Sequence, residues 1–284
     1  MILVTGATGV VGRPLVQQLA EAGAEVRAVS RDPYNAGLPE GVEVVAGDPG
    51  DAATMTAALA GVTAMFLNPR TVGTAAEKLL ALAREQGVRR VVAMSAINVE
   101  WALDRQPSRL NGDFNKEVEE AVTASGMEWA CLRSGVYAVN TIGMWAGQLR
   151  AGDVVRGAYP DGAWASLHEA DIAAVGAHGL LTDDLIGRKP VLTGPVALTQ
   201  AEMVAAIAAA TGRPLRFQEV PPEAAQEGMM RAGIPERAAA GFLRMQAEAY
   251  GQPDLVSGEV EAILGRPGRT YGEWAADHAA DFAA

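Results

Sequence analysis

The stretch that decides the fold is TGATGVVG, residues 5–12. It follows the apolar run ILV and precedes a segment, VGRPLVQQLAEAG, whose apolar residues recur at helical spacing. The glycines at 6, 9 and 12 form GxxGxxG, a variant of the dinucleotide-binding GxGxxG pattern. Gly6 lets the chain turn off the strand, Gly9 lets a diphosphate approach the backbone, and Gly12 lets the helix pack close to the sheet.

This turn therefore predicts a binding site for NAD(H) or NADP(H), with the diphosphate at the helix N-terminus. The alternative is a tight structural turn without a ligand. The residues expected to bind the cofactor here are Gly6, Thr8, Gly9, Val10, Val11 and Gly12.

Short apolar runs then alternate with longer segments of helical period. We predict strands at 1–5, 24–31, 42–48, 63–68, 89–96 and 128–134, and helices at 11–23, 55–61, 75–87 and 114–126. Strands and helices alternating at this spacing predict an α/β fold, a doubly wound parallel Rossmann sheet with right-handed crossovers.

The rhythm changes after Ser134. Residues 136–164 look loop-rich and carry several aromatic side chains, whereas 168–181 reads as a helix and 189–195 as a short strand. Helices dominate from Leu198 onward, starting with a capping box of Thr199 and Glu202. We therefore predict an NAD(P)-binding core at 1–135, completed by about 165–195. Residues 136–164 and 196–284 would form a smaller, mostly helical substrate-binding part.

Composition narrows the class of protein. The chain has 284 residues, of which 49% are hydrophobic, and a formal net charge of −11, which disfavours nucleic acid as a partner. No apolar run reaches the length of a membrane span, and the N-terminus does not resemble a secretory signal. The single cysteine, Cys131, lies in an apolar strand and suits a reducing compartment. We expect a cytoplasmic monomer or homodimer with no membrane partner.

The end of the second strand bears on the choice of cofactor. NAD-selective proteins usually place an acidic residue here, but this strand ends in Ser30 and Arg31. The neutral serine leaves room for a 2′-phosphate that Arg31 can bind, so the sequence favours NADP(H) over NAD(H). Alternatively, Arg31 is a solvated charge or the partner of Asp32, which could itself contact a ribose.

Other strand ends carry further candidates for cofactor binding. Asp48 follows the third strand and would either reach the adenine amine or cap the next helix. Asn68 and Pro69 follow the fourth strand and are expected to border the cofactor. Arg70 beside them would contact a phosphate or lie on the surface.

Several segments together resemble the NmrA-like branch of the atypical short-chain dehydrogenases/reductases. They are TGATGVVG, LRSGVYAVN, ADIAAV, VLTGP and the tail GRPGRTYGEWAADHAADF, and they cover almost the whole chain. The resemblance implies a Rossmann core, NAD(P)H binding and often the reduction of quinones or other carbonyl compounds. Some members of this branch act as nucleotide-sensing regulators, so the resemblance also implies that possible role.

The segment Gly112–Lys116 departs from the ordinary short-chain dehydrogenase pattern, which places Tyr-x-x-x-Lys on a helix. This chain keeps Lys116, with Glu119 three residues later as in the family, but has glycine at the tyrosine position. Lys116 would bind the nicotinamide ribose, or else pair with Glu120. Ser95 lies where the family has its active-site serine and would contact substrate or nicotinamide, or else satisfy the backbone.

A missing tyrosine favours particular acceptors. A simple ketone becomes an alkoxide that needs a positioned acid, whereas a quinone becomes an aromatised phenolate that solvent can protonate later. We therefore predict an NADPH-dependent oxidoreductase with the catalytic residues Lys116, Ser95 and Tyr137, the last as replacement proton donor. Its substrate would be a quinone or polycyclic, polyketide-type aromatic, with oxygen-coupled hydroxylation as a variant.

The substrate itself is expected to meet residues that follow the sixth strand. They are Tyr137, Asn140, Met144, Trp145, Trp164 and His168. The alternative for the aromatic residues is that they pack the second part onto the NAD(P)-binding core, and no metal site is predicted. The alternative function is a catalytically silent protein that senses NADP(H).

Overall fold

The computed structural model describes residues 1–106, 108–109, 112–249 and 256–283. The chain divides into two compact units. The first comprises residues 1–134, 169–192 and 262–265, and the second comprises 135–168, 193–261 and 266–284. Residues 262–265, expected from the sequence in the C-terminal part, group with the first unit.

The first unit is built on a seven-stranded parallel sheet in the order β3-β2-β1-β4-β5-β6-β9. This is the doubly wound sheet that the sequence predicted. The strands are β1 (Ile2–Val4), β2 (Val26–Ser30), β3 (Glu43–Ala46), β4 (Ala64–Leu67), β5 (Arg90–Ala96), β6 (Glu128–Ser134) and β9 (Val191–Leu192).

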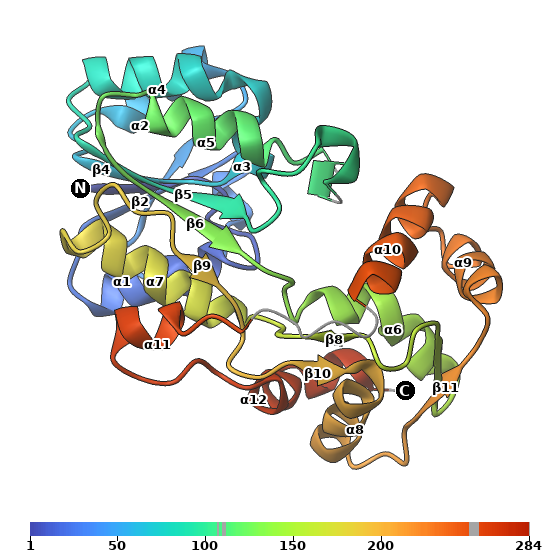
Figure 1. Ribbon diagram of the computed structural model, residues 1–284. Helices are drawn as coiled ribbons and strands as arrows, with labels where there is room; N and C mark the ends of the chain where they lie inside the picture. The colour runs from blue at the N-terminus through green and yellow to red at the C-terminus, as the bar shows by residue number, and fades with distance from the viewer. Residues whose placement is uncertain (107, 110–111, 250–255, 284) are drawn as a thin grey trace. The chain divides into compact units, whose positions relative to one another are not determined.

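Helices cover both faces of this sheet (Figure 1). One face carries α1 (Gly12–Glu21) and α7 (Glu169–Leu181), and the other carries α2 (Thr56–Leu59), α4 (Ala76–Glu85) and α5 (Asn115–Thr123). The short α3 (Pro69–Val72) follows β4, and the 3₁₀ turns are η1 (Pro33–Asn35), η2 (Ala52–Met55), η3 (Gly73–Ala75) and η4 (Leu103–Arg105).

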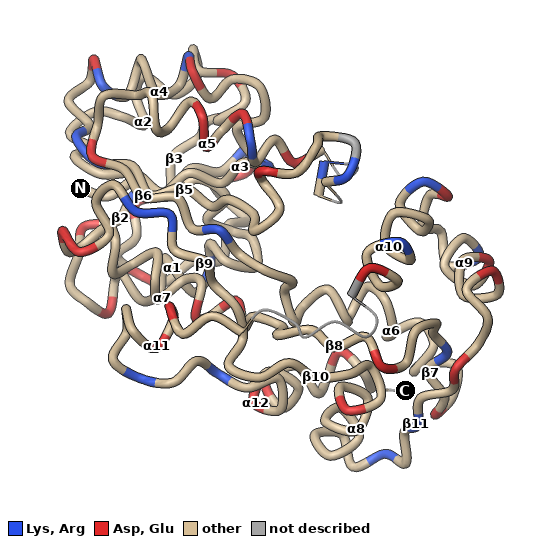
Figure 2. Tube along the Cα trace, in the orientation of Figure 1, with Lys and Arg blue, Asp and Glu red and all other residues tan. Residues whose placement is uncertain are grey.

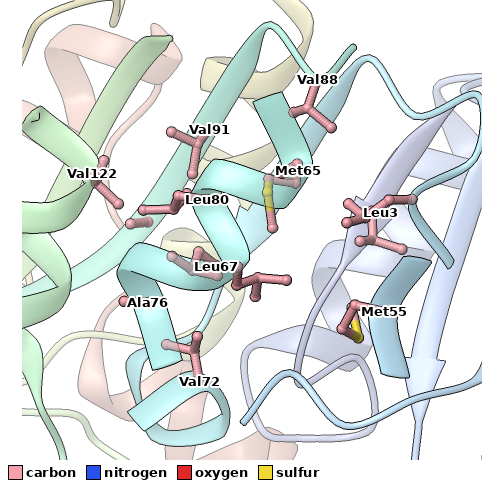
Figure 3. Packing of buried hydrophobic residues seen from close by; sticks show 14 of the residues in the cluster. Leu3, Met55, Met65, Leu67, Val72, Ala76, Leu80, Val88, Val91 and Val122 are labelled. Carbon is pink, nitrogen blue, oxygen red and sulfur yellow. The ribbon is translucent and has the colours of Figure 1, made fainter. Parts of the chain in front are cut away.

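Apolar side chains of the strands meet those of α2, α4 and α5 in a continuous core (Figure 3). Leu3, Met65 and Val91 come from neighbouring strands, and Leu80 and Val122 come from the helices. All five side chains are buried, as the apolar runs in a parallel sheet require. This core fixes the ends of the strands, and with them the residues at the carboxyl edge.

The second unit is mixed. Its helices are α6 (Asn140–Ala151), α8 (Gln200–Thr211), α9 (Pro222–Arg231), α10 (Glu236–Ala249) and α12 (Tyr271–Asp277), followed by η6 (Ala279–Phe282). Two small sheets join β7 (Val154–Gly157) to β11 (Arg216–Glu219) and β8 (Ala163–Trp164) to β10 (Leu198–Thr199). The helix α11 (Glu259–Leu264) spans the division between the units.

One prediction about this unit was wrong. Residues 136–164 were expected to be loop-rich, but they contain the 12-residue helix α6 and two strands. The glycines at 143 and 147 lower helix propensity and hide the pattern. Burial of Trp145 and Leu149 on one face stabilises the helix nonetheless. The capping box of Thr199 and Glu202, by contrast, is confirmed at the start of α8.

Acidic and basic residues are interspersed along the described chain (Figure 2). None of the helices in the described ranges combines the length and apolar character needed to cross a membrane.

Candidate functional site

The glycine-rich loop joins β1 to α1. Gly6 has a φ of 66°, in the left-handed region that favours glycine, and its carbonyl accepts a hydrogen bond of 3.0 Å from the Gly9 amide. A Cβ at Gly12 would lie 2.0 Å from the Gly6 oxygen, so only glycine allows α1 to begin here. The close approach that Gly12 permits is therefore to the turn itself, whereas the sequence analysis expected an approach to the sheet.

The tip of this loop is open on its outer side. Thr8, Gly9 and Val10 are exposed, while Val11 and Gly12 are buried beneath them. A Cβ at Gly9 would meet only the Gly6 oxygen within 4 Å, at 3.2 Å, and no described side chain caps the start of α1. The exposed backbone and the helix dipole suit a diphosphate, so the residues present match the cofactor group that the motif implies.

The end of β4 lies directly beside the loop. The buried Thr5 hydroxyl donates to the Phe66 carbonyl at 3.0 Å and accepts from the Asn68 amide at 2.9 Å, which ties β1 to the end of β4. A Cβ at Gly6 would lie 2.7 Å from Asn68 Nδ2, so the Asn68 side chain borders the loop. Its Oδ1 caps α3, which Pro69 opens.

At the end of β2, Ser30 is engaged locally. Its hydroxyl donates to the Asp32 carbonyl at 2.9 Å and accepts from the Asp32 amide at 3.1 Å. The Asp32 carboxylate accepts from Asn35 at 2.7 Å. Arg31 is exposed and forms no ion pair with any residue in the described ranges, so its guanidinium is available to an anion.

A second arginine near this edge escaped the sequence analysis. Arg13 Nε donates to the Thr8 carbonyl at 3.0 Å, and its Nη1 donates to the Gly37 carbonyl at 2.7 Å. Arg13 thus joins the glycine-rich loop to the segment after β2. The only signal in the sequence was a basic residue in the first turn of α1, where the helix dipole disfavours positive charge.

Asp48 lies after β3 and stabilises its own turn. Its Oδ1 accepts from the Gly50 amide at 2.9 Å, and its amide donates to Thr54 at 3.0 Å. Asp51, rather than Asp48, caps the next helical turn. The capping alternative for Asp48 was therefore wrong, and a contact with adenine stays a prediction.

Lys116 is the second residue of α5 and is partly buried. It forms no ion pair with Glu120 or with any other residue that the structure describes, so the pairing alternative was wrong. Gly112 lies before α5, with a φ of 83°, and its amide donates to the Arg109 carbonyl at 3.0 Å. The two positions therefore do not share a helix face, because Gly112 belongs to the turn that precedes the helix.

The strongest polar cluster of the first unit surrounds Glu119. Its buried carboxylate accepts from Ser95 Oγ at 2.6 Å, from Arg133 Nη2 at 2.6 Å and Nε at 3.2 Å, and pairs with Lys189 Nζ at 2.9 Å. Arg133 also binds Glu100 at 2.5 Å. We call Ser95, Glu119, Arg133 and Lys189 the Glu119 cluster.

The Glu119 cluster fixes the charge of its members. Burial would raise the pKa of Glu119, but hydrogen bonds from Arg133, Ser95 and Lys189 hold that pKa below its ordinary value. The hydrogen bonds that Arg133 donates to Glu119 in turn raise the pKa of Arg133. A charged Arg133 directly after the apolar run WACL of β6 was the signal in the sequence for an acidic partner nearby.

Tyr137 and Asn140 belong to the second unit. The backbone of Tyr137 forms a parallel bridge with Leu167, and its side chain is partly buried. Asn140 is the exposed first residue of α6. Their predicted contacts with a substrate stay predictions.

The aromatic residues of this unit pack inside it. Trp145 is 2% exposed and lies in the core with Trp274 and Phe282, and Met144 packs against the same cluster. Trp164 is buried and meets Phe242 edge-on, with 5.5 Å between the ring centroids. The Trp145 ring therefore packs within the core of the second unit itself, and a contact of these residues with a substrate stays a prediction.

His168 is also buried, and its Nε2 lies 3.4 Å from Asp277 Oδ2. In the described ranges, no group of three or more histidine, cysteine or acidic side chains could hold a metal ion.

Comparison with known proteins agrees with this geometry. A family model described as NAD(P)H-binding matches residues 6–180. The chain is 38% identical to (4-alkanoyl-5-oxo-2,5-dihydrofuran-3-yl)methyl phosphate reductase of Streptomyces griseus, over 100% of this chain and 99% of that protein. It is 33% identical to NAD(P)H azoreductase of Xenophilus azovorans over 100% of each chain.

Solved structures share the fold. The NADPH complex of an NADPH-dependent quinone oxidoreductase from Escherichia coli superposes with a TM-score of 0.81 at 24% identity, covering 98% of this chain and 99% of that one. A triphenylmethane reductase of Citrobacter with NADP(H) gives a TM-score of 0.78 at 21% identity, covering 98% and 99% of the two chains.

Proposed function

This chain belongs to the NAD(P)H-binding, NmrA-like group of the atypical short-chain dehydrogenases/reductases, and from that premise we propose that it reduces a quinone or polycyclic aromatic compound with NADPH. Relatives that are named reductases or oxidoreductases support an NAD(P)H-dependent oxidoreductase as the general class. The observation that carries the proposal is the open glycine-rich loop after β1, together with Lys116 on α5, which forms no ion pair with any residue in the described ranges.

Different residues of the first unit would bind different parts of the cofactor. The backbone from Gly6 to Gly12 would bind the diphosphate, and Arg31 would meet a 2′-phosphate. Lys116, with no acidic partner among the described residues, would donate to the ribose hydroxyls. When bound, the nicotinamide supplies the hydride, and the protein supplies orientation and electrostatics.

The substrate class rests on the absence of a tyrosine at Gly112. The turn conformation there leaves no helical position from which a side chain would reach the same site as Lys116. Acceptors whose reduced form is a weak base need no strong acid in the protein, and quinones are such acceptors. The name of one relative, a quinone oxidoreductase, supports this class, whereas two others are named as reductases of a furanone phosphate and of azo compounds.

A panel of acceptors tests the proposed reaction. The purified protein is mixed with NADPH and a quinone, a polycyclic quinone or a simple aliphatic ketone, and loss of NADPH absorbance is followed. We expect turnover with both quinones and little with the ketone. Comparable rates on the ketone, or tight NADPH binding without turnover of any acceptor, would contradict the proposal, and the second outcome would favour an NADP(H) sensor.

The preference for NADPH is tested separately with Arg31→Ala. Loss of a charge-assisted hydrogen bond to a phosphate costs about 1.5–3 kcal/mol. We therefore expect the KM for NADPH to rise by roughly one to two orders of magnitude while the KM for NADH stays unchanged. Lys78→Ala, on the exposed side of α4, is the matched control for a lost positive charge. Equal effects on both cofactors would remove Arg31 from the 2′-phosphate site.

A further inference from the structure

The Glu119 cluster lies at the carboxyl ends of β5 and β6, which is the edge where ligands bind in open parallel sheets. Ser95 and Arg133 are register partners on these two strands, and Glu119 reaches them from α5. We propose that Glu119 is a positioning residue that fixes α5 on this edge and so places Lys116 for cofactor binding, and that Ser95 acts through Glu119 rather than on the substrate. This inference rests on the cofactor role given to Lys116 above.

The geometry of α5 shows why such an anchor matters. Lys116 precedes Glu119 by three residues, so the two side chains leave the helix on adjacent faces, less than one turn apart. No described side chain caps the start of α5. The buried face of the helix carries Val118, Glu119 and Val122, of which Glu119 alone makes polar bonds to the strands. Glu119 is therefore the directional contact that sets the height of α5 along β5 and β6.

The charges around Glu119 pair with one another and not with Lys116. Glu119 binds both Arg133 and Lys189, and Arg133 also binds Glu100, which lies outside the Glu119 cluster. Glu119 therefore already has two cationic partners, and Lys116 forms no ion pair with it or with any other residue in the described ranges. Lys189 Nζ also lies 5.8 Å from the centroid of the Trp129 ring. Lys116 thus keeps its donors for a ligand.

Ser95, which the family resemblance offers as a contact of substrate or nicotinamide, lies within β5 and bonds to Glu119. Its hydroxyl has one hydrogen, which it donates to the Glu119 carboxylate across an Oγ–Oε2 distance of 2.6 Å. An ionised carboxylate accepts only, so Ser95 must be the donor of this bond. A buried Ser95 with its proton engaged has no donor for a substrate oxygen. It steadies Glu119 instead of stabilising the product of hydride transfer.

A thermodynamic cycle on cofactor binding tests this arrangement. The dissociation constant of NADPH is measured by fluorescence for the wild type, Glu119→Gln, Lys116→Met and the double variant. We expect each single substitution to weaken binding roughly tenfold, and Glu119→Gln to have little further effect once Lys116 is gone, because Glu119 would act on binding only through the placement of Lys116 and the two effects would therefore not add. Ser95→Ala should weaken NADPH binding in the same direction, without a selective loss of kcat.

Two matched substitutions serve as controls. Glu117→Gln removes a carboxylate from the same helix, where Glu117 pairs with Arg109 at 2.6 Å, and Glu128→Gln removes one from the amino end of β6. Both should leave the dissociation constant within about twofold of the wild type. If Glu119→Gln does not fold, Arg133→Lys takes its place, since it keeps the charge but loses the two-point contact with Glu119.

Several outcomes would overturn the inference. Additive effects of Glu119→Gln and Lys116→Met would reduce Glu119 to a structural residue. A Ser95→Ala variant with unchanged NADPH binding and a lowered kcat would make Ser95 a donor to the substrate. The readout needs no turnover, so coupled binding without reduction of any acceptor would refute the proposed function alone. Quinone turnover with uncoupled binding would refute this inference alone.

Discussion

The two ends of the β5–β6 strand pair carry the same chemistry in different surroundings. At the amino end, Arg90 binds Glu128 at 2.8 Å and also pairs with Asp183, and these carboxylates are 48% and 83% exposed. At the carboxyl end, Arg133 binds Glu119, which is 5% exposed, and Glu100, which is 70% exposed. The difference lies in one buried carboxylate, and it occurs at the edge where a parallel sheet binds its ligands.

Burial changes what such a cluster does. Exposed ion pairs contribute little to the free energy of unfolding because solvent screens them and holding the side chains costs entropy. A buried carboxylate must keep its partners, since an unpaired charge in the interior is strongly unfavourable. The carboxyl-end cluster is thus sensitive to the loss of any member, whereas the amino-end cluster tolerates change. This sensitivity is the cost of holding α5 in a defined place.

The largest expected effect separates the two ends by stability. Glu119→Gln removes the buried charge that Arg133 and Lys189 share, and we expect it to lower the free energy of unfolding by about 3–5 kcal/mol. Glu128→Gln at the exposed end should cost at most about 1 kcal/mol. Urea denaturation of both variants, in the absence of cofactor, measures the difference.

Equal losses in the two variants would break the comparison, because burial would then have no bearing on the strength of these clusters. A loss of stability in Glu128→Gln alone would mean that the exposed cluster, and not the buried one, stabilises the fold. Tm values from thermal unfolding of the same variants provide an independent check.

A second contrast compares glycines at the two edges of the sheet. Gly12 at the carboxyl edge has no room for a Cβ, which would meet the Gly6 oxygen at 2.0 Å and Ala7 Cα at 2.7 Å. Gly23, which precedes β2 at the amino edge, has a φ of 76° and nothing within 4 Å of a Cβ. We expect Gly12→Ala to cost about 3 kcal/mol and to abolish NADPH binding. Gly23→Ala should cost about 1 kcal/mol of strain alone.

The measurements are urea denaturation and NADPH fluorescence on both alanine variants. A Gly12→Ala protein that binds NADPH as the wild type does would show that the loop is not a diphosphate site. Loss of binding in Gly23→Ala would show that the amino edge contributes as well.

Much of the first unit could be predicted from the sequence because its signals are local. An apolar run such as MILVT or RRVVAMSA is buried on both faces, and a glycine-rich turn followed by a helix has few other uses. The second unit was harder to predict. Its helix α6 contains Gly143 and Gly147, and its strands are two to four residues long, so tertiary packing outweighs local propensity there.

Single residues of the candidate site were harder still to predict. Ser95 and Lys116 were singled out by their places in the chain. The partner of Ser95 is Glu119, which lies 24 residues away in the sequence. Lys116 has no ion-pair partner in the described ranges. Asp48 stabilises its own turn instead of capping a helix, and Lys116 does not pair with Glu120. Turn geometry and helix packing decide these outcomes, and neither can be read from the local sequence. Arg13 was missed because its contacts are to carbonyl groups of the backbone, which leave no mark on the sequence.

A smaller effect follows from the titration of Glu119. Because its pKa in the folded protein lies below the ordinary carboxyl value of about 4.3, it contributes stability that is fully present above that value. This stability is lost as pH falls through the folded pKa. We therefore expect the Tm difference between the wild type and Glu119→Gln to be constant near neutral pH and to shrink below about pH 4. A difference that instead grows toward acid pH would mean that the Glu119 pKa is raised.

The smallest effect is expected midway along the same strands, where Cys131 lies opposite Ala93. Burial raises the pKa of the Cys131 thiol to about 12, and the nearby Glu119 charge acts in the same direction. The reactive thiolate is therefore scarce, and the side chain is shielded in the core. A thiol reagent at pH 8 should leave the native protein unlabelled for as long as it stays folded, and should label one cysteine after unfolding in urea.

Because Glu119 helps to keep the proton on Cys131 and the helix in place, Glu119→Gln should speed labelling of Cys131 through local opening, whereas Glu128→Gln should not. Fast labelling of the wild type would show that the Cys131 thiol is accessible to solvent. The centre of the β5–β6 strand pair would then be no more rigid than its two polar ends.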